Sequence, residues 1–315
     1  MWTDLETAIS DHFDSTIHSG LVPPPPNWEM EYTQLKPSPN QGECRDILFP
    51  GLFLRSAKIQ TTLSMSGCGD CERHIFVFLS NMKGEGRLNG NPLPEGLTAV
   101  CGTQPFEAIL PPTDMLGITI NRGMMNEYLE DVEGLIAPDW MGNGIYTLGV
   151  RESTSRATKM FKAHFEDASP LADANGIKSA IFSMLGIILS NSDSDPEVVY
   201  SWQNRIQIVR RVREYIIDRI SEPIKIGEIC RQIGVSRRAL QYIFQDVLGV
   251  NPVAFLRILR LNRARRDLFD NENTFQVKDV IDRWGFWHPS RFSGEYRQMF
   301  EELPSETLRR CRFIG

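Results

Sequence analysis

The sequence has no long hydrophobic run. Its longest apolar stretch, Ala180 to Leu189, contains serine and glycine and is much shorter than the ~20 residues that a membrane helix needs. The first residues, Met1 to Glu6, also lack the basic start of a secretory signal. We therefore expect a soluble cytoplasmic protein that makes no contact with a membrane.

Histidine is scarce, and the five that occur are dispersed: His12, His18, His74, His164 and His288. Metal enzymes built on cupin barrels commonly use a His-x-His pair with a carboxylate and a further histidine, and this sequence has no such cluster. It also has no Gly-rich phosphate loop and no G-x-S-x-G nucleophile elbow. These absences argue against an enzyme, a cofactor and a metal, and they leave a cupin-type metal enzyme as the less favoured alternative.

Cysteine is sparse as well. Six cysteines at scattered positions suit a reducing compartment. Cys68 and Cys71 form a C-x-x-C, but no second pair follows at zinc-finger spacing. Gly67 to Asp70 is also a good hairpin turn. We favour the turn and leave a redox or metal role of the two cysteines open.

The chain as a whole has no excess of positive charge, because its formal net charge is -6. The charge is unevenly distributed, however. From Asn204 onward there are 21 Lys and Arg against 14 Asp and Glu, a net of +7, which leaves -13 for the part before it. A basic C-terminal region on an acidic protein indicates that a nucleic-acid partner, if there is one, binds that region.

The C-terminal region contains a pattern typical of a helix-turn-helix. Apolar residues recur there at helical spacing, namely Ile226, Ile229, Cys230 and Ile233. Gly234 can adopt a positive φ where this helix ends, and Ser236 is a good N-cap for the next. Leu240, Ile243 and Phe244 would then bury the second helix against the first.

The same plan occurs again about fifty residues later. The apolar face of the first helix is formed by Val277, Val280, Ile281 and Trp284. Gly285 and Phe286 form the turn, and a helix from Trp287 to Met299 follows, in which Pro289 is tolerated because the first helical turn has no partner for its missing N–H. Its buried side would consist of Phe292, Tyr296, Met299 and Phe300.

A continuous helix from Pro252 to Leu268 is predicted between the two copies, with Phe255, Leu256, Leu259, Leu261 and Leu268 among its apolar positions. Such a helix would fix the distance between the two units, which should match roughly 34 Å, one turn of DNA, if both enter successive major grooves. This stretch and the chain's end are rich in arginine, and these side chains are candidates for phosphate contacts or internal ion pairs: Arg257, Arg260, Arg263, Arg265, Arg266, Arg309, Arg310 and Arg312.

The outward side chains of each second helix are suited to DNA. Arginine can bond guanine edges and glutamine can bond adenine edges, each through two hydrogen bonds. We expect the first unit to contact DNA through Ser236, Arg237, Arg238, Gln241 and Tyr242. The corresponding candidates of the second unit are His288, Pro289, Ser290, Arg291, Ser293 and Arg297. A pair of packed helices without a nucleic-acid role is the alternative for either copy alone, and the two copies in tandem favour DNA binding.

The stretch from Ile206 to Arg310 resembles the DNA-binding domain of the AraC/XylS family of bacterial transcription regulators. The features that carry the resemblance are Ser236 to Leu240, Phe244 with Leu248 and Gly249, Pro252, Arg260 to Asn262 with Ala264, Gly285 with Phe286, Phe292, Phe300 and Pro304 with Ser305. Within the family, the sequence is similar to the ethanolamine-utilisation subgroup at four places: Val235 to Gln241, Arg260 to Asn262, Val277 to Asp279 and Trp284 to His288. That likeness makes ethanolamine with cobalamin a candidate effector, although the DNA-binding half does not encode the choice of effector.

Two positions depart from the family pattern. Glu301 stands where the family usually has glycine, so we expect the turn before Pro304 to be made differently. Gly294, in the exposed half of the second reading helix, costs about 1 kcal/mol of helix stability relative to alanine and offers no side chain to a base. We therefore expect the second unit to contact fewer bases than the first.

The part before Asn204 divides into three segments. Residues 1–42 predict a helix followed by a proline-rich arm, with Pro23 to Pro26 and Pro37 to Pro39. Residues 43–121 predict short strands separated by turns, which favours a small β-barrel or jelly roll of cupin type as a sensor domain. The strands are expected at Cys44 to Phe49, Leu52 to Leu63, His74 to Ser80, Gly86 to Leu88, Thr98 to Cys101, Phe106 to Leu110 and Leu116 to Asn121.

Residues 122–203 predict a helical linker or dimerisation region, and residues 204–312 the DNA-binding domain. The main helices of the linker region are expected at Ser153 to Asp167 and Gly176 to Asn191. The second is apolar on several faces, so it should lie in a core or at a dimer interface.

An effector pocket, if the strands enclose one, should be lined by inward-facing aromatic side chains, for which the candidates are Phe53, Phe76, Phe78 and Phe106. Together with the resemblance, these observations predict an α+β protein that regulates transcription. We expect a DNA-binding activator controlled by a small-molecule effector, with RNA polymerase as a partner and a homodimer possible. A regulator that responds to a protein partner or to its own abundance, without a ligand, is the alternative.

Overall fold

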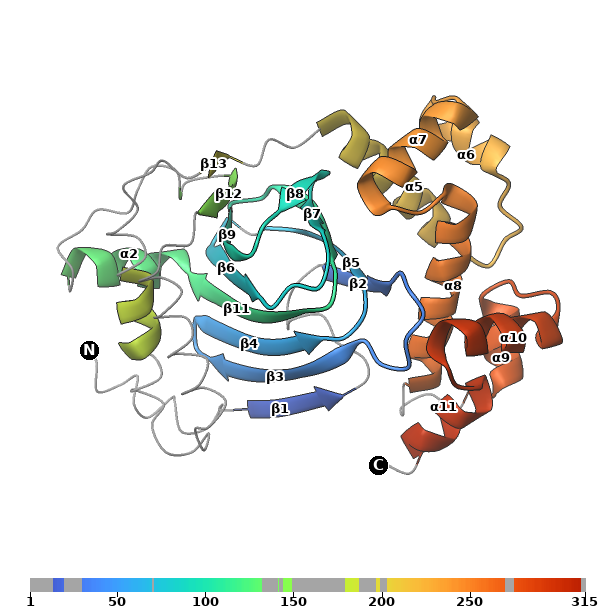
Figure 1. Cartoon of the computed structure of the whole chain (residues 1–315), viewed down its shortest axis with the longest axis horizontal. Coiled ribbons are helices and arrows are strands. Elements are labelled where there is room, and N and C mark those ends of the chain that lie inside the picture. The colour runs from blue at the N-terminus through green and yellow to red at the C-terminus, as the bar shows by residue number, and fades with distance from the viewer. Residues whose placement is uncertain are drawn as a thin grey trace.

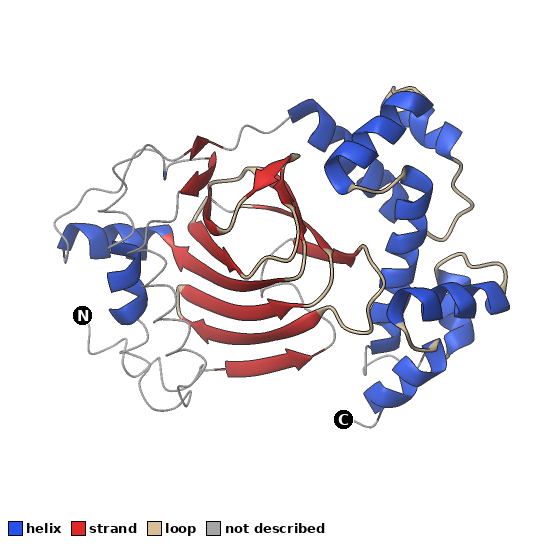
Figure 2. Ribbon diagram, viewed as in Figure 1, coloured by secondary structure: helices blue, strands red, loops and turns tan. Residues whose placement is uncertain are grey.

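The computed structural model describes residues 14–19, 30–69, 71–131, 141, 144–148, 179–186, 197–198, 203–269 and 275–312. Figures 1 and 2 show a sheet-rich N-terminal part with a helical C-terminal part stacked along one of its sides. The predicted helix at the start of the chain, the run Pro23 to Pro26 and the predicted helix Ser153 to Asp167 lie outside the described residues.

Thirteen described strands form two antiparallel sheets. The eight-stranded sheet has the order β1-β3-β4-β11-β6-β9-β12-β13, with β1 Asp14–Ser19, β3 Gly42–Phe49, β4 Leu52–Ile59, β11 Thr113–Asn121, β6 Arg73–Ser80, β9 Gly96–Cys101, β12 Gly144–Leu148 and β13 Glu197–Val198. The five-stranded sheet has the order β2-β5-β10-β7-β8, with β2 Met30–Gln34, β5 Leu63–Cys68, β10 Pro105–Leu110, β7 Gly86–Leu88 and β8 Asn91–Leu93.

Each of the seven predicted strands overlaps a strand of the structure, but the expected closed barrel is not found. Within the described part of the chain, neither sheet closes on itself. The predicted strand Leu52 to Leu63 shows why. It ends at Ile59, and the chain then crosses through residues 60–62 from β4 in one sheet to β5 in the other. A period-two pattern identifies strands but does not specify which strands pair.

The two faces of the eight-stranded sheet pack against different partners. One face meets the five-stranded sheet in a core that includes Ala57, Ile75 and Phe106. The opposite face is covered by α2, Arg122–Asp131, and by the helical residues 179–186. In the predicted helix Gly176 to Asn191 the apolar side chains of the described residues are therefore core, with Ile181 and Leu185 fully buried, whereas Ser179 and Ser183 are exposed. Strands β1 and β2 come from the predicted N-terminal arm, so the sheets extend beyond residues 43–121.

The helical C-terminal part follows the predicted order closely. Its helices are α5 Gln203–Asp218, α6 Ile226–Ile233, α7 Arg237–Leu248, α8 Pro252–Phe269, α9 Val277–Arg283, α10 Pro289–Phe300 and α11 Pro304–Arg312. Their apolar faces form one core, which also takes in Leu35 and Ile109 from the N-terminal part. No described helix is by itself long and apolar enough to span a bilayer, and α7 and α8 meet that test only as a pair bent by 54°.

Glu301 makes the turn after α10 in the left-handed conformation that glycine usually supplies at the end of a helix. It adopts the left-handed conformation, with φ 58°, and its N–H bonds to the carbonyl of Arg297. The expectation of a different turn was therefore wrong. A residue with a Cβ is strained in this conformation.

We expect Glu301→Gly to raise the free energy of unfolding by about 0.5 to 1 kcal/mol because it relieves this strain. Chemical denaturation would measure the change. Gln298→Gly, at an exposed position inside α10, is the matched control and should be destabilising by about 1 kcal/mol. Glu301→Gly would contradict the prediction if it destabilised the protein as the control does.

Candidate nucleic-acid interface

The first helix-turn-helix unit consists of α6, a short turn and α7. Gly234 has a φ of 80° and ends α6, and the Ser236 side chain accepts a hydrogen bond from the N–H of Ala239 at 3.1 Å. Both local predictions are confirmed. The apolar faces pack as expected, because Ile229 and Cys230 of α6 and Leu240, Ile243 and Phe244 of α7 are all buried.

The outward face of α7 presents the predicted side chains to solvent. Arg237, Arg238 and Gln241 are exposed near the beginning of the helix. Tyr242 is 57% exposed, and the guanidinium of Arg205 lies 5.1 Å from the centre of its ring. The hydroxyl of Ser236 is engaged as a helix cap. Two arginines and a glutamine therefore form the part of this face that is free to reach base edges.

The second unit repeats this geometry with α9 and α10. Gly285 has a φ of 67° in the turn, and a Cβ added to it would come within 2.9 Å of the backbone oxygen of Ser221. Pro289 lies in the first turn of α10, as predicted, but the helix begins at Pro289 and not at the predicted Trp287. Phe292 and Tyr296 are fully buried, as is Val280 of α9.

The outward face of α10 offers fewer free groups than that of α7. His288, Ser290 and Arg297 are exposed. Arg291 is paired with Glu295 at 2.8 Å, and the hydroxyl of Ser293 donates to the carbonyl of Pro289 at 3.0 Å. A Cβ on Gly294 would have no neighbouring atom within 4 Å, so the position lies open.

Trp287 is a surface residue that the sequence reading did not single out. Its side chain is 71% exposed, and Val253 at the start of α8 is 56% exposed. Both line a groove of about 360 Å³ between α8 and the beginning of α10, together with Arg257, Arg260 and His288. The sequence contained a signal for this residue. Trp287 follows the turn residues Gly285 and Phe286 directly, and it precedes Phe292, the first of the predicted buried positions.

Each arginine of α8 has a hydrogen-bond or ion-pair partner within the protein. Their partners are Glu295 for Arg257, the carbonyl of Ile220 for Arg260, Glu31 for Arg263 and Arg266, and Glu302 for Arg265. Near the end of the chain, Arg310 also pairs with Glu302, at 3.2 Å. The predicted internal ion pairs are therefore found, and phosphate contacts by the more exposed Arg257 and Arg310, whose side chains are 48% and 41% exposed, stay a prediction.

Arg265 is the most deeply placed of these arginines, with no exposed surface. Burial lowers the pKa of its guanidinium, as it does for Arg260 and Arg266, yet an arginine remains charged at neutral pH. The charge is balanced by Glu302 at 3.1 Å, and the ring of Phe300 lies 4.4 Å from the guanidinium carbon. Arg265 therefore connects α8 to the end of α10.

The four phenylalanines proposed for an effector pocket do not lie together. Phe76 and Phe78 point from β6 into the core beneath α2, whereas Phe106 belongs to the core between the two sheets. Phe53 lies near the latter, against Arg55 at 5.5 Å. Side chains on neighbouring strand positions alternate between faces, and only the observed pairing shows which face each one shares. The structure brings together no pocket from this set.

A buried ion pair lies on the inner face of the eight-stranded sheet and was missed in the sequence. Arg55 donates two hydrogen bonds to Asp46, at 2.7 and 2.6 Å, and a longer one to the Tyr32 hydroxyl at 3.4 Å. The pairing with Asp46 raises the pKa of Arg55, and burial raises the pKa of Tyr32. A single arginine directly after the apolar run Leu52 to Leu54 was the available signal.

The C-x-x-C lies at the end of β5. The Sγ of Cys68 donates to the carbonyl of Thr103 at 3.2 Å, and Cys71 is exposed. Across the part of the chain that the structure describes, no group of three or more His, Cys, Asp or Glu could hold a metal ion. A role for this pair stays untested.

Comparison with known proteins adds a family assignment to this geometry. Residues 229–310 match the model of a helix-turn-helix domain. A probable thc operon regulatory protein of Rhodococcus erythropolis is 40% identical over 107 residues, which is 34% of this chain and 32% of that protein. The XylDLEGF operon transcriptional activator 3 of Pseudomonas putida is 35% identical over 101 residues, covering 32% and 30% of the two chains.

A solved structure is also similar to part of this chain. The crystal structure of a probable AraC family transcriptional regulator from Rhodopseudomonas palustris is 37% identical and covers 34% of this chain and 98% of its own, with a TM-score of 0.32. The match to the two curated relatives spans about a third of their length. The residues that the helix-turn-helix model matches, 229–310, lie in the helical C-terminal part.

Proposed function

The C-terminal part of this chain belongs to the AraC/XylS family of DNA-binding transcription regulators, and we propose that the whole protein activates transcription by binding two successive major grooves through α7 and α10. The observation that carries this proposal is the tandem arrangement of two exposed reading helices. They are joined by the unbroken 18-residue helix α8, which is roughly 27 Å long at 1.5 Å per residue.

Base contacts are proposed for the exposed side chains near the beginning of each reading helix, because recognition helices enter the groove with their N-terminal residues. In the first unit these are Ser236, Arg237, Arg238, Gln241 and Tyr242. In the second unit they are His288, Pro289, Ser290, Arg291 and Ser293, and Arg297, in the last turn of α10, is proposed as a phosphate contact. Since Arg291 and Ser293 already have partners inside α10, the first unit should carry more of the specificity.

The two-sheet part is proposed as the sensor, with a cupin or jelly-roll relationship, and residues 204–312 as the DNA-binding domain. An effector bound there would bias the orientation of the reading helices and so alter DNA occupancy or contact with RNA polymerase. The sequence similarity to ethanolamine-utilisation regulators makes ethanolamine with cobalamin the first effector to test. We also propose that the protein forms a homodimer through residues 122–203.

The proposal is tested by selecting bound sequences from a random DNA pool with the purified full chain, followed by binding measurements at two salt concentrations. The expected motif has two blocks about one helical turn apart, roughly 34 Å between centres. Weak, salt-sensitive binding without a motif, in the presence and absence of the effector candidates, would refute sequence-specific regulation.

Replacing Arg297 with alanine should weaken binding to all DNA sequences alike. Its exposed position in the last turn of α10 places it away from the base-reading end, where a phosphate contact is expected. The logarithmic salt slope should fall by about 1, the value for one lost phosphate contact. The matched control is Arg210→Ala, on the exposed face of α5, which should leave the slope unchanged. A base-specific loss for Arg297→Ala would contradict this assignment.

A further inference from the structure

The five-stranded sheet of the N-terminal part contacts both reading helices. In each case the contact is made at the C-terminal end of the helix. The last four carbonyls of an α-helix have no partner within the helix. In the last turn of α7, Asp246 offers such a carbonyl, and the guanidinium of Arg87 in β7 donates to it. In the last turn of α10, the carbonyl of Met299 is the corresponding acceptor.

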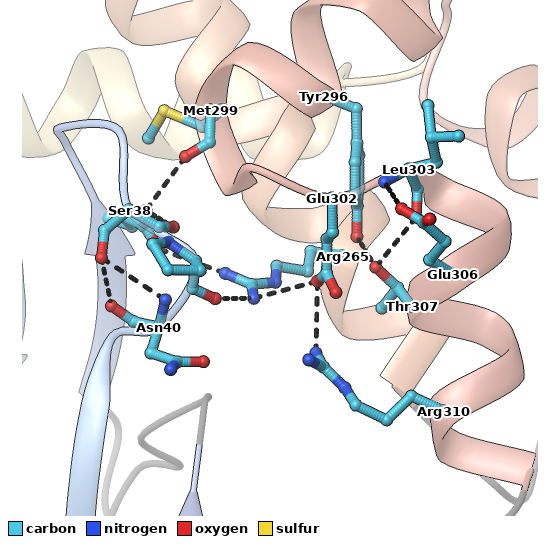
Figure 3. Close-up of polar contacts among 12 residues, drawn as sticks. Ser38, Asn40, Arg265, Tyr296, Met299, Glu302, Leu303, Glu306, Thr307 and Arg310 are labelled. Carbon is cyan, nitrogen blue, oxygen red and sulfur yellow. Dashed lines mark hydrogen bonds and ion pairs between the residues drawn. The ribbon is translucent and has the colours of Figure 1, made fainter.

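The carbonyl of Met299 receives two donors, one from the last residue of β2 and one from the segment between β2 and β3. The backbone N–H of Ser38 lies 3.0 Å from its carbonyl oxygen, and the side-chain nitrogen of Gln34 lies 3.3 Å from it. Figure 3 shows Ser38 reaching Met299, with Arg265 beside it connected to Glu302. The carbonyl of Pro39 also accepts a hydrogen bond from Arg265, so the segment is held at more than one point.

The attachment around Gln34 is firm. Its backbone N–H and carbonyl bond to the two ends of the Asn262 amide at 2.9 and 3.0 Å, and the side-chain oxygen of Gln34 accepts from Arg265 at 3.3 Å. Gln34 and Arg265 have no exposed surface. Leu35 packs into the core of the DNA-binding helices. Edge strand β2 is thus joined to α8 and α10.

The middle of the same sheet is joined to α5, the helix that precedes the first unit, through a buried ion pair. Glu107 of β10 receives two hydrogen bonds from Arg213 of α5, at 2.9 and 2.7 Å. Since the order of the sheet is β2-β5-β10-β7-β8, its strands hold α10, α5 and α7 through β2, β10 and β7. One rigid layer therefore contacts both units at the ends that lie away from the base-reading residues.

We propose that the five-stranded sheet is a clamp that holds both reading helices by their C-terminal ends and so fixes the spacing between half-sites that the protein accepts. The clamp leaves the N-terminal residues of both helices free for the groove. This proposal rests on the proposed function. It means that the N-terminal part sets the relative position of the two units and does not cover their DNA-binding face. A ligand or partner that shifts one strand of this sheet would change the orientation of both units together.

The test uses the full chain and a set of duplexes that carry the selected motif with its two blocks moved apart or together by one and two base pairs. One base pair shifts a block by roughly 3.4 Å and rotates it by about 35°. The quantity measured is the ratio of Kd for a shifted duplex to Kd for the selected one. This ratio cancels any change in overall affinity that comes from losing a charge.

Arg87→Met and Gln34→Met each remove one attachment while keeping a long side chain. We expect either variant to lower the spacing ratio by about two- to tenfold, the range for losing a hydrogen bond. The matched controls, Arg210→Met and Gln207→Met, change exposed residues of α5 and should keep the ratio of the unmodified chain. Thermal unfolding of each variant verifies the fold, and Arg87, which is only half-buried, carries the test if the Gln34 variant does not fold.

Two results would overturn the clamp while leaving the proposed function standing. In one, the unmodified chain selects a two-block motif but shows no spacing preference. In the other, the variants keep the preference or lose affinity equally at all spacings. If no motif is selected at all, the proposed function fails and the clamp fails with it.

Discussion

Replacing Arg213 with methionine is expected to lower the free energy of unfolding by about 3 to 5 kcal/mol, the cost of leaving one member of a buried ion pair without its partner. The side chains of Arg213 and Glu107 are 6% and 4% exposed. Arg213 also donates to the hydroxyl of Ser64 at 3.1 Å. Denaturation followed by circular dichroism would measure the loss.

Two controls separate this effect from the simple loss of an arginine. Arg210→Met breaks an exposed pair with Glu214, whose side chains are 54% and 55% exposed, and should cost less than about 1 kcal/mol. Glu107→Gln combined with Arg213→Met removes the uncompensated charge and should recover most of the stability. The interpretation is wrong if Arg213→Met costs no more than Arg210→Met, or if the double variant is less stable than Arg213→Met alone.

Replacing Arg238 with alanine should weaken binding to the selected DNA by about 1 to 3 kcal/mol and relax the preference at one base pair. The reason is that an exposed arginine at the beginning of α7 can donate two hydrogen bonds to one guanine. Gln241→Ala should have an effect of the same kind at a neighbouring position. Repeating the DNA selection with each variant, together with Kd measurements, would detect both changes.

The control for this pair of variants lies on the same helix. Gln245 is exposed near the end of α7, where its side chain bonds to the carbonyl of Gly249 at 3.3 Å, and Gln245→Ala should leave the base preference unchanged. An unaltered preference in Arg238→Ala would remove that residue from direct base recognition and leave it, at most, a phosphate contact.

The C-terminal helices could be predicted because their signals are local. Gly234, Ser236 and Pro289 act within one or two turns of their own position, through a positive φ, a side-chain cap and a missing N–H. Helical periodicity then identified the buried faces, including Phe292 and Tyr296 of α10. None of these inferences depends on which distant segment the helix meets.

The N-terminal part was harder because its determinants are distant in sequence. Strand positions were recognisable, but the crossing from β4 to β5 and the separation of Phe76 from Phe106 follow from strand pairing, which alternation alone does not specify. Arg265 illustrates the same limit in a helix. A face rich in arginine is usually solvated, and it is buried here because residues 34–39 pack against it.

The open position at Gly294 bears on how the specificity of this protein can change over time. A side chain introduced there meets no atom within 4 Å and would gain roughly 0.5 to 1 kcal/mol of helix propensity. An asparagine or arginine could therefore add a base contact without a cost in stability to be offset elsewhere. A single substitution in the second unit could therefore create a preference for a new operator sequence. The base preference of the first unit would stay the same.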